Sequence, residues 1–565
     1  MKAADDKSTA GPVRHSSNPK SRLEVEAWPD LEPAAVERLR AAGVTRAVEV
    51  GDVLFEVDQD SYPLAYIERG AVSIVDRAND QVVSQVDAGD FVGEIGMLMG
   101  QRTFFAGVVS AAGSIIEVQP DALRELVATV PEVGDAVVSA FAARRRVLIE
   151  WGEGGLVIVG DEGDPDARRL RQFVGRNRIP HRWLDRADAA GVAALAATCD
   201  LPATGTAVVT GRSAVLASPS TRDLARAIGL DLAADATGKV FDVLIVGAGP
   251  AGLAAAVYAA SEGLSVVVVE DTAIGGQAGT SSRIENYLGF PQGVSGTELA
   301  YRGQIQAIKF GARFVAPRRA TSLNCHDDSD SFHVGLDDDT VLKSRSLVLA
   351  NGVQYRRLPL DRLAEFEGRG VYYAATEIEA RFCRDTEVVI VGGGNSAGQA
   401  AMFLSRYATC THIVVRGEGL AATMSSYLST RIENDDRIKL WTHTEVARLG
   451  GGDSSDSGDV GDSLKEITLR DRNSGKESRI ASAALFIMIG AAPNTDWLGG
   501  QIALDDNGFV LTGRDARPDL DSYATTLPGV YAVGDLRSGS VKRVASAVGE
   551  GSVVISSVHK HLEST

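Results

Sequence analysis

The chain has 565 residues, too many for one hydrophobic core, which indicates about three or four domains. Its 57 Lys and Arg against 75 Asp and Glu give a net charge of −18, which argues against nucleic-acid binding. No run of about 18 apolar residues predicts a membrane span, and four cysteines without CxxC spacing exclude a disulfide framework or a zinc knuckle. A reducing cytoplasm is the expected setting.

The N-terminal part of the chain shows three segments. Residues 1–20 lack an apolar core and are expected to form a disordered tail rather than a signal peptide. Residues 21–150 combine a short helix, closely spaced strands with Gly and Asp turns, and two helical patterns that start near Pro120 and Pro131. Residues 155–231 alternate strand and helix patterns, which predicts a small α/β domain after a linker at 151–155.

Two glycine fingerprints dominate the rest of the chain: GAGPAG at 247–252 and GGGNSA at 392–397. Each follows an apolar strand pattern and opens a helix of small residues. Glycines allow a tight turn and a close backbone approach, and the N-terminus of the helix binds a pyrophosphate. The assigned turn residues are Gly247, Gly249, Pro250, Ala251 and Gly252 in the first unit and Gly392, Gly394, Asn395, Ser396 and Ala397 in the second.

Two such units predict an α/β fold with two Rossmann-like, three-layer dinucleotide-binding domains. The expected boundaries are 240–355 with 486–565 for a flavin domain and 356–485 for a nicotinamide domain. Two dinucleotides held near each other indicate electron transfer from a nicotinamide to a flavin.

The residue that ends the second strand of each unit distinguishes the two cofactors. Glu270 occupies that place in the first unit, where a carboxylate accepts hydrogen bonds from an adenosine ribose. Arg416 occupies it in the second unit, where a guanidinium suits a 2′-phosphate. NADPH is therefore expected, with NADH as the alternative because Glu418 lies close by.

The segments IGGQAGTSSRIENYLGFP and GVYAVGDLRSGSVKRVASAVGEG resemble the flavin-binding segments of low-molecular-weight thioredoxin reductases. The resemblance covers the chain from Phe241 to its C-terminus and implies FAD as cofactor and a homodimer as assembly. The further FAD-binding residues that it implies are Gly275, Gly276, Gln277, Asn286, Gly534, Asp535, Arg543, Val544 and Ala545.

The chain departs from that family at the dithiol. Where the family has Cys-Ala-Thr-Cys, this sequence has Ala374, Ala375, Thr376 and Glu377. Disulfide exchange needs a thiolate and a resolving thiol, and Cys383 has no partner at CxxC spacing. We therefore expect the flavin to reduce an external acceptor, either a small molecule or a small redox protein, and we assign no catalytic acid or base.

The two N-terminal domains carry resemblances of their own. DFVGEIGMLMGQRTFFAGVV at 90–109 resembles the phosphate cassette of cyclic nucleotide-binding β-rolls, with Gly93 and Glu94 as nucleotide-binding candidates. The arginine of that family falls at Thr103, so a cyclic nucleotide and a β-roll kept for packing remain alternatives. Residues 155–231 resemble a thioredoxin or glutaredoxin fold without its redox cysteines, which implies a scaffold.

Three functions are compatible with these features. The first is an FAD-dependent NAD(P)H oxidoreductase that the β-roll regulates. The second is a flavin-based redox sensor that signals to a partner protein. The third, which has less support, is a thioredoxin-disulfide reductase that uses non-standard cysteines such as Cys383.

Overall fold

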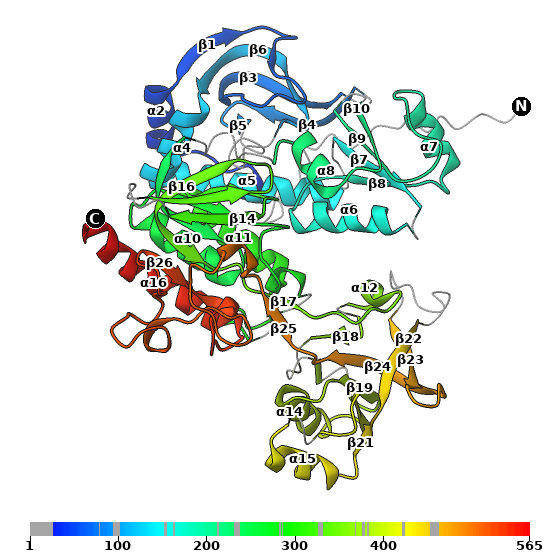
Figure 1. Cartoon of the computed structure of the whole chain (residues 1–565). Helices are drawn as coiled ribbons and strands as arrows, with labels where there is room; N and C mark the ends of the chain where they lie inside the picture. The colour runs from blue at the N-terminus through cyan, green and yellow to red at the C-terminus, as the bar shows by residue number, and fades with distance from the viewer. Residues whose placement is uncertain are drawn as a thin grey trace, which may run out of the picture.

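The computed structural model describes most of the chain from Glu26 to Ser564 (Figure 1). The residues outside the description are 1–25, 78–79, 94–101, 152–154, 162–163, 212–213, 231–237, 282–283, 285, 326–330, 368, 374, 376–378, 381–382, 421–423, 452–462 and 565. The predicted tail at 1–20 therefore lies outside the described residues. The rest forms four units, each with its own sheet.

The first unit, residues 26–151, is an antiparallel sheet in the order β1-β6-β3-β4, with β2 paired to β6 and β5 paired to β3. Its apolar face closes on three helices around Leu39, Ile115 and Phe141, all buried. The elements are α2 (Pro33–Ala42), β1 (Val44–Val48), β2 (Val53–Phe55), β3 (Leu64–Asp76), β4 (Gln81–Asp87), β5 (Phe91–Val92), β6 (Ala106–Val118), α4 (Pro120–Thr129) and α5 (Pro131–Trp151).

The helix α5 corrects one expectation. The linker predicted at 151–155 begins too early, because α5 continues through Trp151. Its apolar spacing persists to Val147 and Leu148, and both side chains are buried.

The second unit, residues 155–230, is a four-stranded mixed sheet in the order β10-β9-β7-β8. Its core is continuous with the first unit, because Phe104 and Leu148 of the first unit pack with Leu156 and Leu170 of the second. The two units therefore pack as one body. The elements are β7 (Leu156–Gly160), α6 (Pro165–Arg176), β8 (Arg182–Asp185), α7 (Ala189–Ala196), β9 (Ala207–Thr210), β10 (Ala214–Ala217) and α8 (Thr221–Ala227).

The third unit is built around the first fingerprint. Its sheet has the order β13-β12-β11-β16-β15-β14, and β26 from the end of the chain pairs with β16. Parallel pairing and helices over the sheet leave β11 buried on both faces, which explains its apolar run. The elements are β11 (Val240–Val246), α10 (Pro250–Ser261), β12 (Val266–Val269), α11 (Gly296–Lys309), β13 (Arg313–Val315), β14 (Ala320–Cys325), β15 (Phe332–Leu336), β16 (Val341–Leu349), β26 (Val530–Ala532) and α16 (Val544–Ser564).

The fourth unit is built around the second fingerprint and repeats the same plan. Its sheet has the order β21-β20-β19-β24-β23-β22, with β18 paired to β24. The elements are α12 (Leu363–Phe366), β18 (Val371–Tyr372), β19 (Glu387–Val391), α14 (Asn395–Leu404), β20 (Cys410–Val414), α15 (Ser426–Glu433), β21 (Ile438–Trp441), β22 (Thr444–Gly451), β23 (Leu464–Asp471) and β24 (Glu477–Ile487).

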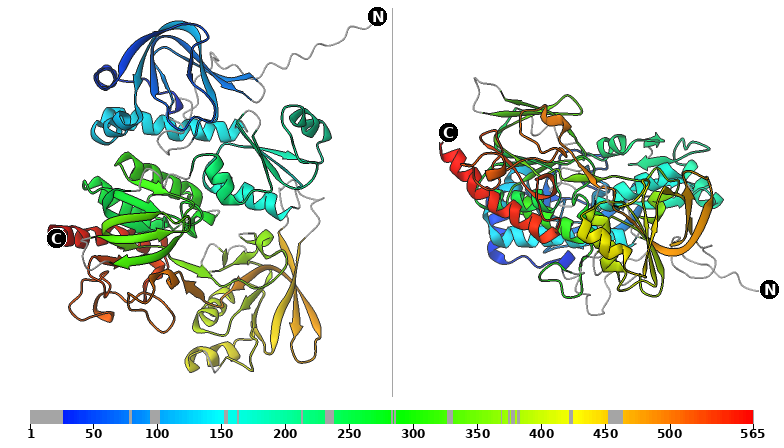
Figure 2. Two further views of the ribbon diagram at one scale, coloured as in Figure 1. Left: turned by 45° about the horizontal axis from the view of Figure 1, so that its top comes forward. Right: turned by 60° about the horizontal axis from the view of Figure 1, so that its bottom comes forward.

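Two short strands connect the third and fourth units: β17 (Val353–Tyr355) and β25 (Ala491–Pro493), which pair antiparallel. Figure 1 and the left view of Figure 2 show the fourth unit set apart from the other three and joined through these strands. Because β24 pairs with β19 as far as Ile487, the chain leaves the fourth unit after Ile487 rather than after Leu485, where the sequence placed the boundary.

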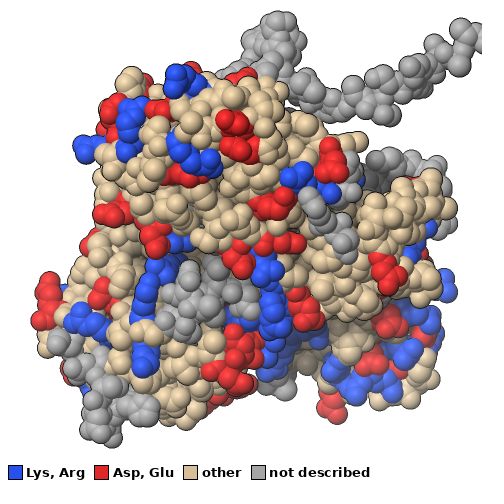
Figure 3. Space-filling model, turned by 90° about the horizontal axis from the view of Figure 1, so that it is seen from above, with Lys and Arg blue, Asp and Glu red and all other residues tan. Residues whose placement is uncertain are grey.

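The distribution of surface charge and the length of the helices concern the expectations about nucleic acid and membrane. On the face shown in Figure 3, Lys and Arg lie among Asp and Glu. Among the described residues, no single helix is long and apolar enough to cross a membrane, and the one bent pair that meets the length and composition test, α4 with α5, turns by 113°.

A buried arginine fixes α5 on the sheet of the first unit. The Arg144 guanidinium, 6% exposed, donates to the Ala27 carbonyl at 2.6 Å, to the Phe91 carbonyl at 2.7 Å and to the Asp90 carboxylate at 2.7 Å. A buried cation of this kind holds its place only while all of its acceptors are present.

Replacing this arginine tests that role. Arg144→Met should destabilise the first unit by about 3–5 kcal/mol, because it removes the buried cation that pairs with the Asp90 carboxylate and donates to two carbonyls. Arg124→Met is the matched control, since Arg124 pairs at the surface with Asp121 and should change stability by less than about 1 kcal/mol. Calorimetric unfolding of both variants gives the comparison, and equal shifts would contradict it.

Candidate dinucleotide sites

The first fingerprint forms the turn between β11 and α10. Gly247 has a φ of +105°, and a Cβ on it would lie 2.4 Å from the Ala350 carbonyl oxygen. A Cβ on Gly252 would lie 1.8 Å from the Gly247 carbonyl oxygen. Gly249 precedes the first helical residue, Pro250, so the free N–H groups of the first turn of α10 point out of the helix at this place. The turn has the geometry of a pyrophosphate cradle.

The acid of the first unit reaches that turn. Glu270 follows β12, and its carboxylate accepts the Ala248 N–H at 2.8 Å and the Thr272 N–H at 3.1 Å. Burial raises the pKa of Glu270, and these two backbone hydrogen bonds oppose the rise. A ribose held beside the fingerprint therefore lies within reach of a carboxylate that the backbone has already oriented.

The predicted Gly-Gly-Gln turn lies against the fingerprint. The Gly275 N–H donates to the Ala248 carbonyl at 2.8 Å, and a Cβ on Gly276 would lie 3.0 Å from the Gly249 Cα. The Gln277 amide donates to the Val353 carbonyl on β17. This glutamine thus connects the dinucleotide turn to the strands that carry the fourth unit.

The C-terminal segment completes the same site. A Cβ on Gly534 would lie 3.0 Å from the Ala251 Cβ, and burial raises the pKa of Asp535. The Gly534 N–H donates at 2.7 Å to Glu550, a buried residue on α16. The predicted residues Arg543, Val544 and Ala545 lie at the start of α16.

The sequence-based assignment missed one residue of this site, and one residue that it assigned lies apart from the others. Glu550 was missed: it also accepts from Arg537 at 2.7 Å and thereby supports the Gly534 turn, and its only sequence signal is an acid among small residues in the last helix. Asn286 is exposed in the loop before α11 and makes no hydrogen bond with the described residues. The predicted glycine turns, Glu270 and the start of α16 therefore lie together around one site. Asn286 makes no hydrogen bond with these described residues.

The described residues fit FAD. Asn351, which follows β16, lies against Gly247, and its Oδ1 is buried with no partner among the described residues. Gly249 faces open space: a Cβ added to it would have the Gly276 Cα, 4.0 Å away, as its nearest neighbour. An unpaired acceptor beside an open glycine turn is what a bound dinucleotide would fill.

The second fingerprint repeats the geometry in the fourth unit. Gly392 has a φ of +146°, and a Cβ on it would lie 2.4 Å from the Met488 carbonyl oxygen. Ala397 is buried beneath this turn, and Gly394 precedes the first residue of α14. Asn395 accepts the Ser425 N–H at 2.8 Å, which ties the start of α14 to the start of α15.

The cation predicted for the second site is accessible. Strand β20 ends at Val414, and Arg416 follows it as an exposed side chain that forms no ion pair with the described residues. Ser396 is exposed on the first turn of α14. Arg416 is thus available to a phosphate at the carboxyl end of the sheet, where dinucleotides bind in such folds.

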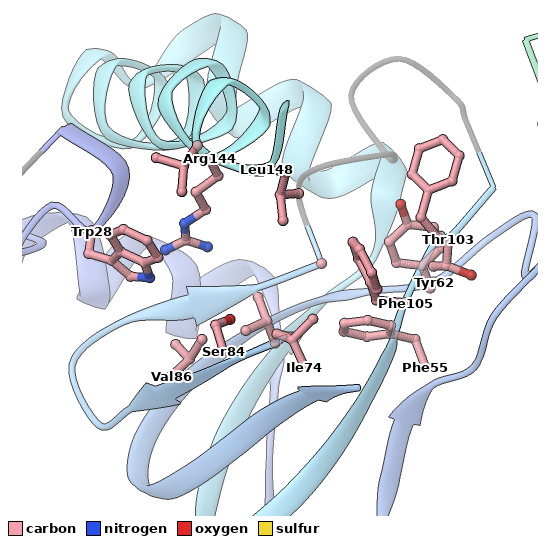
Figure 4. Close-up of a pocket in the computed structure, with 14 residues that line it drawn as sticks. Trp28, Phe55, Tyr62, Ile74, Ser84, Val86, Thr103, Phe105, Arg144 and Leu148 are labelled. Carbon is pink, nitrogen blue, oxygen red and sulfur yellow. The ribbon is translucent and has the colours of Figure 1, made fainter. Parts of the chain in front are cut away.

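A separate pocket lies in the first unit, between the sheet and α5 (Figure 4). Its described lining is mostly apolar and aromatic, and Arg144, already bonded to three acceptors, is its only charged residue. Thr103 stands at the predicted arginine position and donates its hydroxyl to the Glu56 carbonyl. Arg102 pairs with Asp60 at 2.6 Å. The described lining suits an apolar group better than a phosphate, and Glu94 lies outside the described residues.

The third glycine of the first fingerprint offers a test of the flavin site. Gly252→Ala should lower FAD binding at least about tenfold, because its Cβ overlaps the Gly247 carbonyl and displaces the turn. Gly549→Ala is the control, since an added Cβ there meets nothing within 4 Å. The flavin-to-protein absorbance ratio after gel filtration measures both, and full flavin content in Gly252→Ala would refute the geometry.

Comparison with known proteins agrees with this arrangement. Residues 241–551 match the pyridine nucleotide-disulphide oxidoreductase family. The thioredoxin reductase of Mycolicibacterium smegmatis is 33% identical over 313 residues, which are 55% of this chain and 93% of that protein. The thioredoxin reductase of Bacillus subtilis (strain 168) is 31% identical over 326 residues, 58% of this chain and 96% of its own.

A solved structure extends the match to the fold. The thioredoxin reductase of Streptococcus pyogenes MGAS5005 is 28% identical, covers 58% of this chain and 99% of its own, and superposes with a TM-score of 0.50. The predicted α/β fold with Rossmann-like sheets is thereby confirmed. The chain belongs to the pyridine nucleotide-disulphide oxidoreductase family and is a FAD-dependent NAD(P)H oxidoreductase.

Proposed function

We propose that the chain takes hydride from NADPH, passes it to FAD, and delivers the electrons from the flavin to an external acceptor without a cysteine pair in between. The acceptor is a small molecule or a small redox protein. FAD supplies the redox chemistry when bound, and the residues of this chain bind it, orient it and surround it.

The state of the cysteines carries this proposal. The positions of the family's dithiol read Ala-Ala-Thr-Glu at 374–377, of which Ala374, Thr376 and Glu377 lie outside the described residues. Cys383, the nearest cysteine in sequence, is 0% exposed, and its Sγ donates to the Glu379 carbonyl at 3.2 Å. Burial raises the pKa of Cys383 to about 12. A thiol with so high a pKa is protonated at pH 7, and the thiolate is the reactive form.

The other described thiols support the same conclusion. Cys199 and Cys410 are free, and burial raises the pKa of each. Cys199 lies in the second unit, in the turn that follows α7, and Cys410 lies on β20 of the fourth unit. Neither has a cysteine at CxxC spacing in the sequence.

Aromatic side chains border the place where the dithiol would stand. Tyr373, directly before Ala374, stacks on Tyr355 of β17 with ring centroids 5.4 Å apart and planes 9° from parallel. Burial and the nearby Asp535 carboxylate raise the pKa of Tyr355 to about 12. Flat apolar surface beside the flavin site favours a planar acceptor or a protein contact over a disulfide relay.

The remaining parts of the proposal concern assembly and control. We propose a homodimer in the cytoplasm, in which the first unit acts as a regulatory β-roll and the second as a thioredoxin-like scaffold without cysteines. The shared core of these two units and their contacts with the third support a regulatory coupling to the flavin site.

Anaerobic stopped-flow mixing with NADPH tests the proposed reaction. The flavin should bleach faster than about 1 s⁻¹, the low end of ordinary turnover. Titration of free thiols before and after reduction should give the same count, and Cys383→Ser should bleach at the wild-type rate. New thiols on reduction would establish a hidden disulfide relay, and bleaching over minutes would favour the redox sensor.

The nicotinamide preference has a separate test at Arg416. Arg416→Ala should raise the KM for NADPH by about 10- to 100-fold, because it removes a charged hydrogen bond to the 2′-phosphate, and should leave the KM for NADH nearly unchanged. Arg448→Ala is the control, an exposed arginine of the same unit that pairs with Glu477. A wild-type enzyme with a lower KM for NADH would overturn the preference.

A further inference from the structure

The second unit reaches the third through three arginines. Arg178 pairs with Glu298 of α11 at 2.7 Å, and Arg222 of α8 pairs with Asp271 at 3.5 Å. Arg176, the last residue of α6, donates from Nη2 to the Gly276 carbonyl at 3.0 Å. Figures 1 and 2 show α6 lying beside the third unit.

Arg176 differs from the other two in its surroundings. Its contact, Gly276, touches Gly249 at the start of α10, where the fingerprint cradles a pyrophosphate. The charge of Glu270, the carboxylate predicted to bind the ribose, acts on the same guanidinium. Arg176 is therefore directed at the adenosine diphosphate half of the dinucleotide site, whereas Arg178 and Arg222 pair with carboxylates beside that site.

One N–H group of the Arg176 guanidinium donates no hydrogen bond to the described residues. The Nε of Arg176 is buried and has no hydrogen-bond partner among the described residues. Burial of the side chain lowers the pKa of Arg176, a sign that its charge has lost solvent. A partly desolvated cation is costly unless an anion lies close to it, and Arg176 forms no ion pair with the described residues. Phosphate and ribose oxygens at the fingerprint are acceptors of the right kind, because a planar guanidinium matches phosphate geometry.

We infer that Arg176 is an FAD-binding residue contributed by the second unit, with its guanidinium against the adenosine diphosphate half of the cofactor. The second unit then forms one wall of the flavin site, although it carries no fingerprint itself. FAD in turn holds the second unit in place, because a ligand that binds better to the docked arrangement must stabilise that arrangement by the same amount. This inference requires only FAD as cofactor and is independent of the acceptor.

The test is FAD affinity in the full-length protein. FAD is removed, and the apoprotein is titrated with FAD while flavin fluorescence is followed. Arg176→Gln should raise the Kd for FAD by about 10- to 100-fold, the loss expected for one charged hydrogen bond.

Two control variants separate direct contact from loosened docking. Arg178→Gln breaks the neighbouring interface ion pair but leaves Arg176 in place, and it should weaken FAD clearly less than Arg176→Gln does. Arg169→Gln changes an arginine of the same helix that contacts Asp166 and the Pro219 carbonyl, and it should leave the Kd within about twofold. If Arg178→Gln weakens FAD as much as Arg176→Gln, the effect is docking alone and the inference fails.

A conservative variant keeps the test decisive if the glutamine variant does not fold. Arg176→Lys retains the charge but loses the planar fork, and it should bind FAD with an affinity between those of wild type and Arg176→Gln. FAD should also raise the unfolding temperature of the wild type more than that of the lysine variant. A folded lysine variant with wild-type affinity and a wild-type temperature shift would overturn the inference.

Discussion

One buried cation joins the first unit to the second and lies close to the third. Arg145 of α5 is 1% exposed, and its guanidinium donates to the Arg178 carbonyl of the second unit at 2.9 Å and 3.3 Å. Tyr301 of α11, in the third unit, lies close enough for the charge of Arg145 to act on its hydroxyl. Burying a guanidinium is unfavourable unless its acceptors are held in place. The contact therefore fixes α5 against the segment that follows α6, and the placement of Arg176 at the end of α6 depends on it.

Apolar packing and an ion pair also hold the third unit against the first, whereas the fourth unit is held by fewer contacts among the described residues. Tyr301 and Ile305 of the third unit belong to the apolar core of the first unit, and Lys309 pairs with Asp135 of α5. The fourth unit has no comparable anchor among the described residues: it is joined by β17 and β25, which Asn351 and Asn494 fasten through reciprocal amide bonds of 2.6 Å and 2.9 Å. The flavin site thus has a wall fixed to the N-terminal units and a nicotinamide unit on a two-strand hinge.

The parts of the site that local sequence determines were predicted, and the parts that depend on tertiary contacts were not. A turn between a strand and a helix at Gly247 is encoded within a few residues, because only glycine fits so close to the Ala350 carbonyl. Glu550 and Arg176 act on turns far from them in sequence, and an acid or an arginine in a helix gives no local sign of its target. The extension of α5 through Trp151 was missed because glycines follow it in the sequence.

The order of the strands has a consequence for synthesis of the protein. β16 stays unpaired on one edge until β26 arrives, since Leu347 pairs with Val530 across the whole inserted fourth unit. α16 must then pack so tightly on α10 that a Cβ on Gly551 would lie 2.1 Å from the Ala251 carbonyl oxygen. On the ribosome, the cradle made early by β11 and α10 is therefore completed only after β26 and α16 have been translated. A chain broken off before α16 lacks the helix that packs on α10 and the Glu550 carboxylate that supports the Gly534 turn.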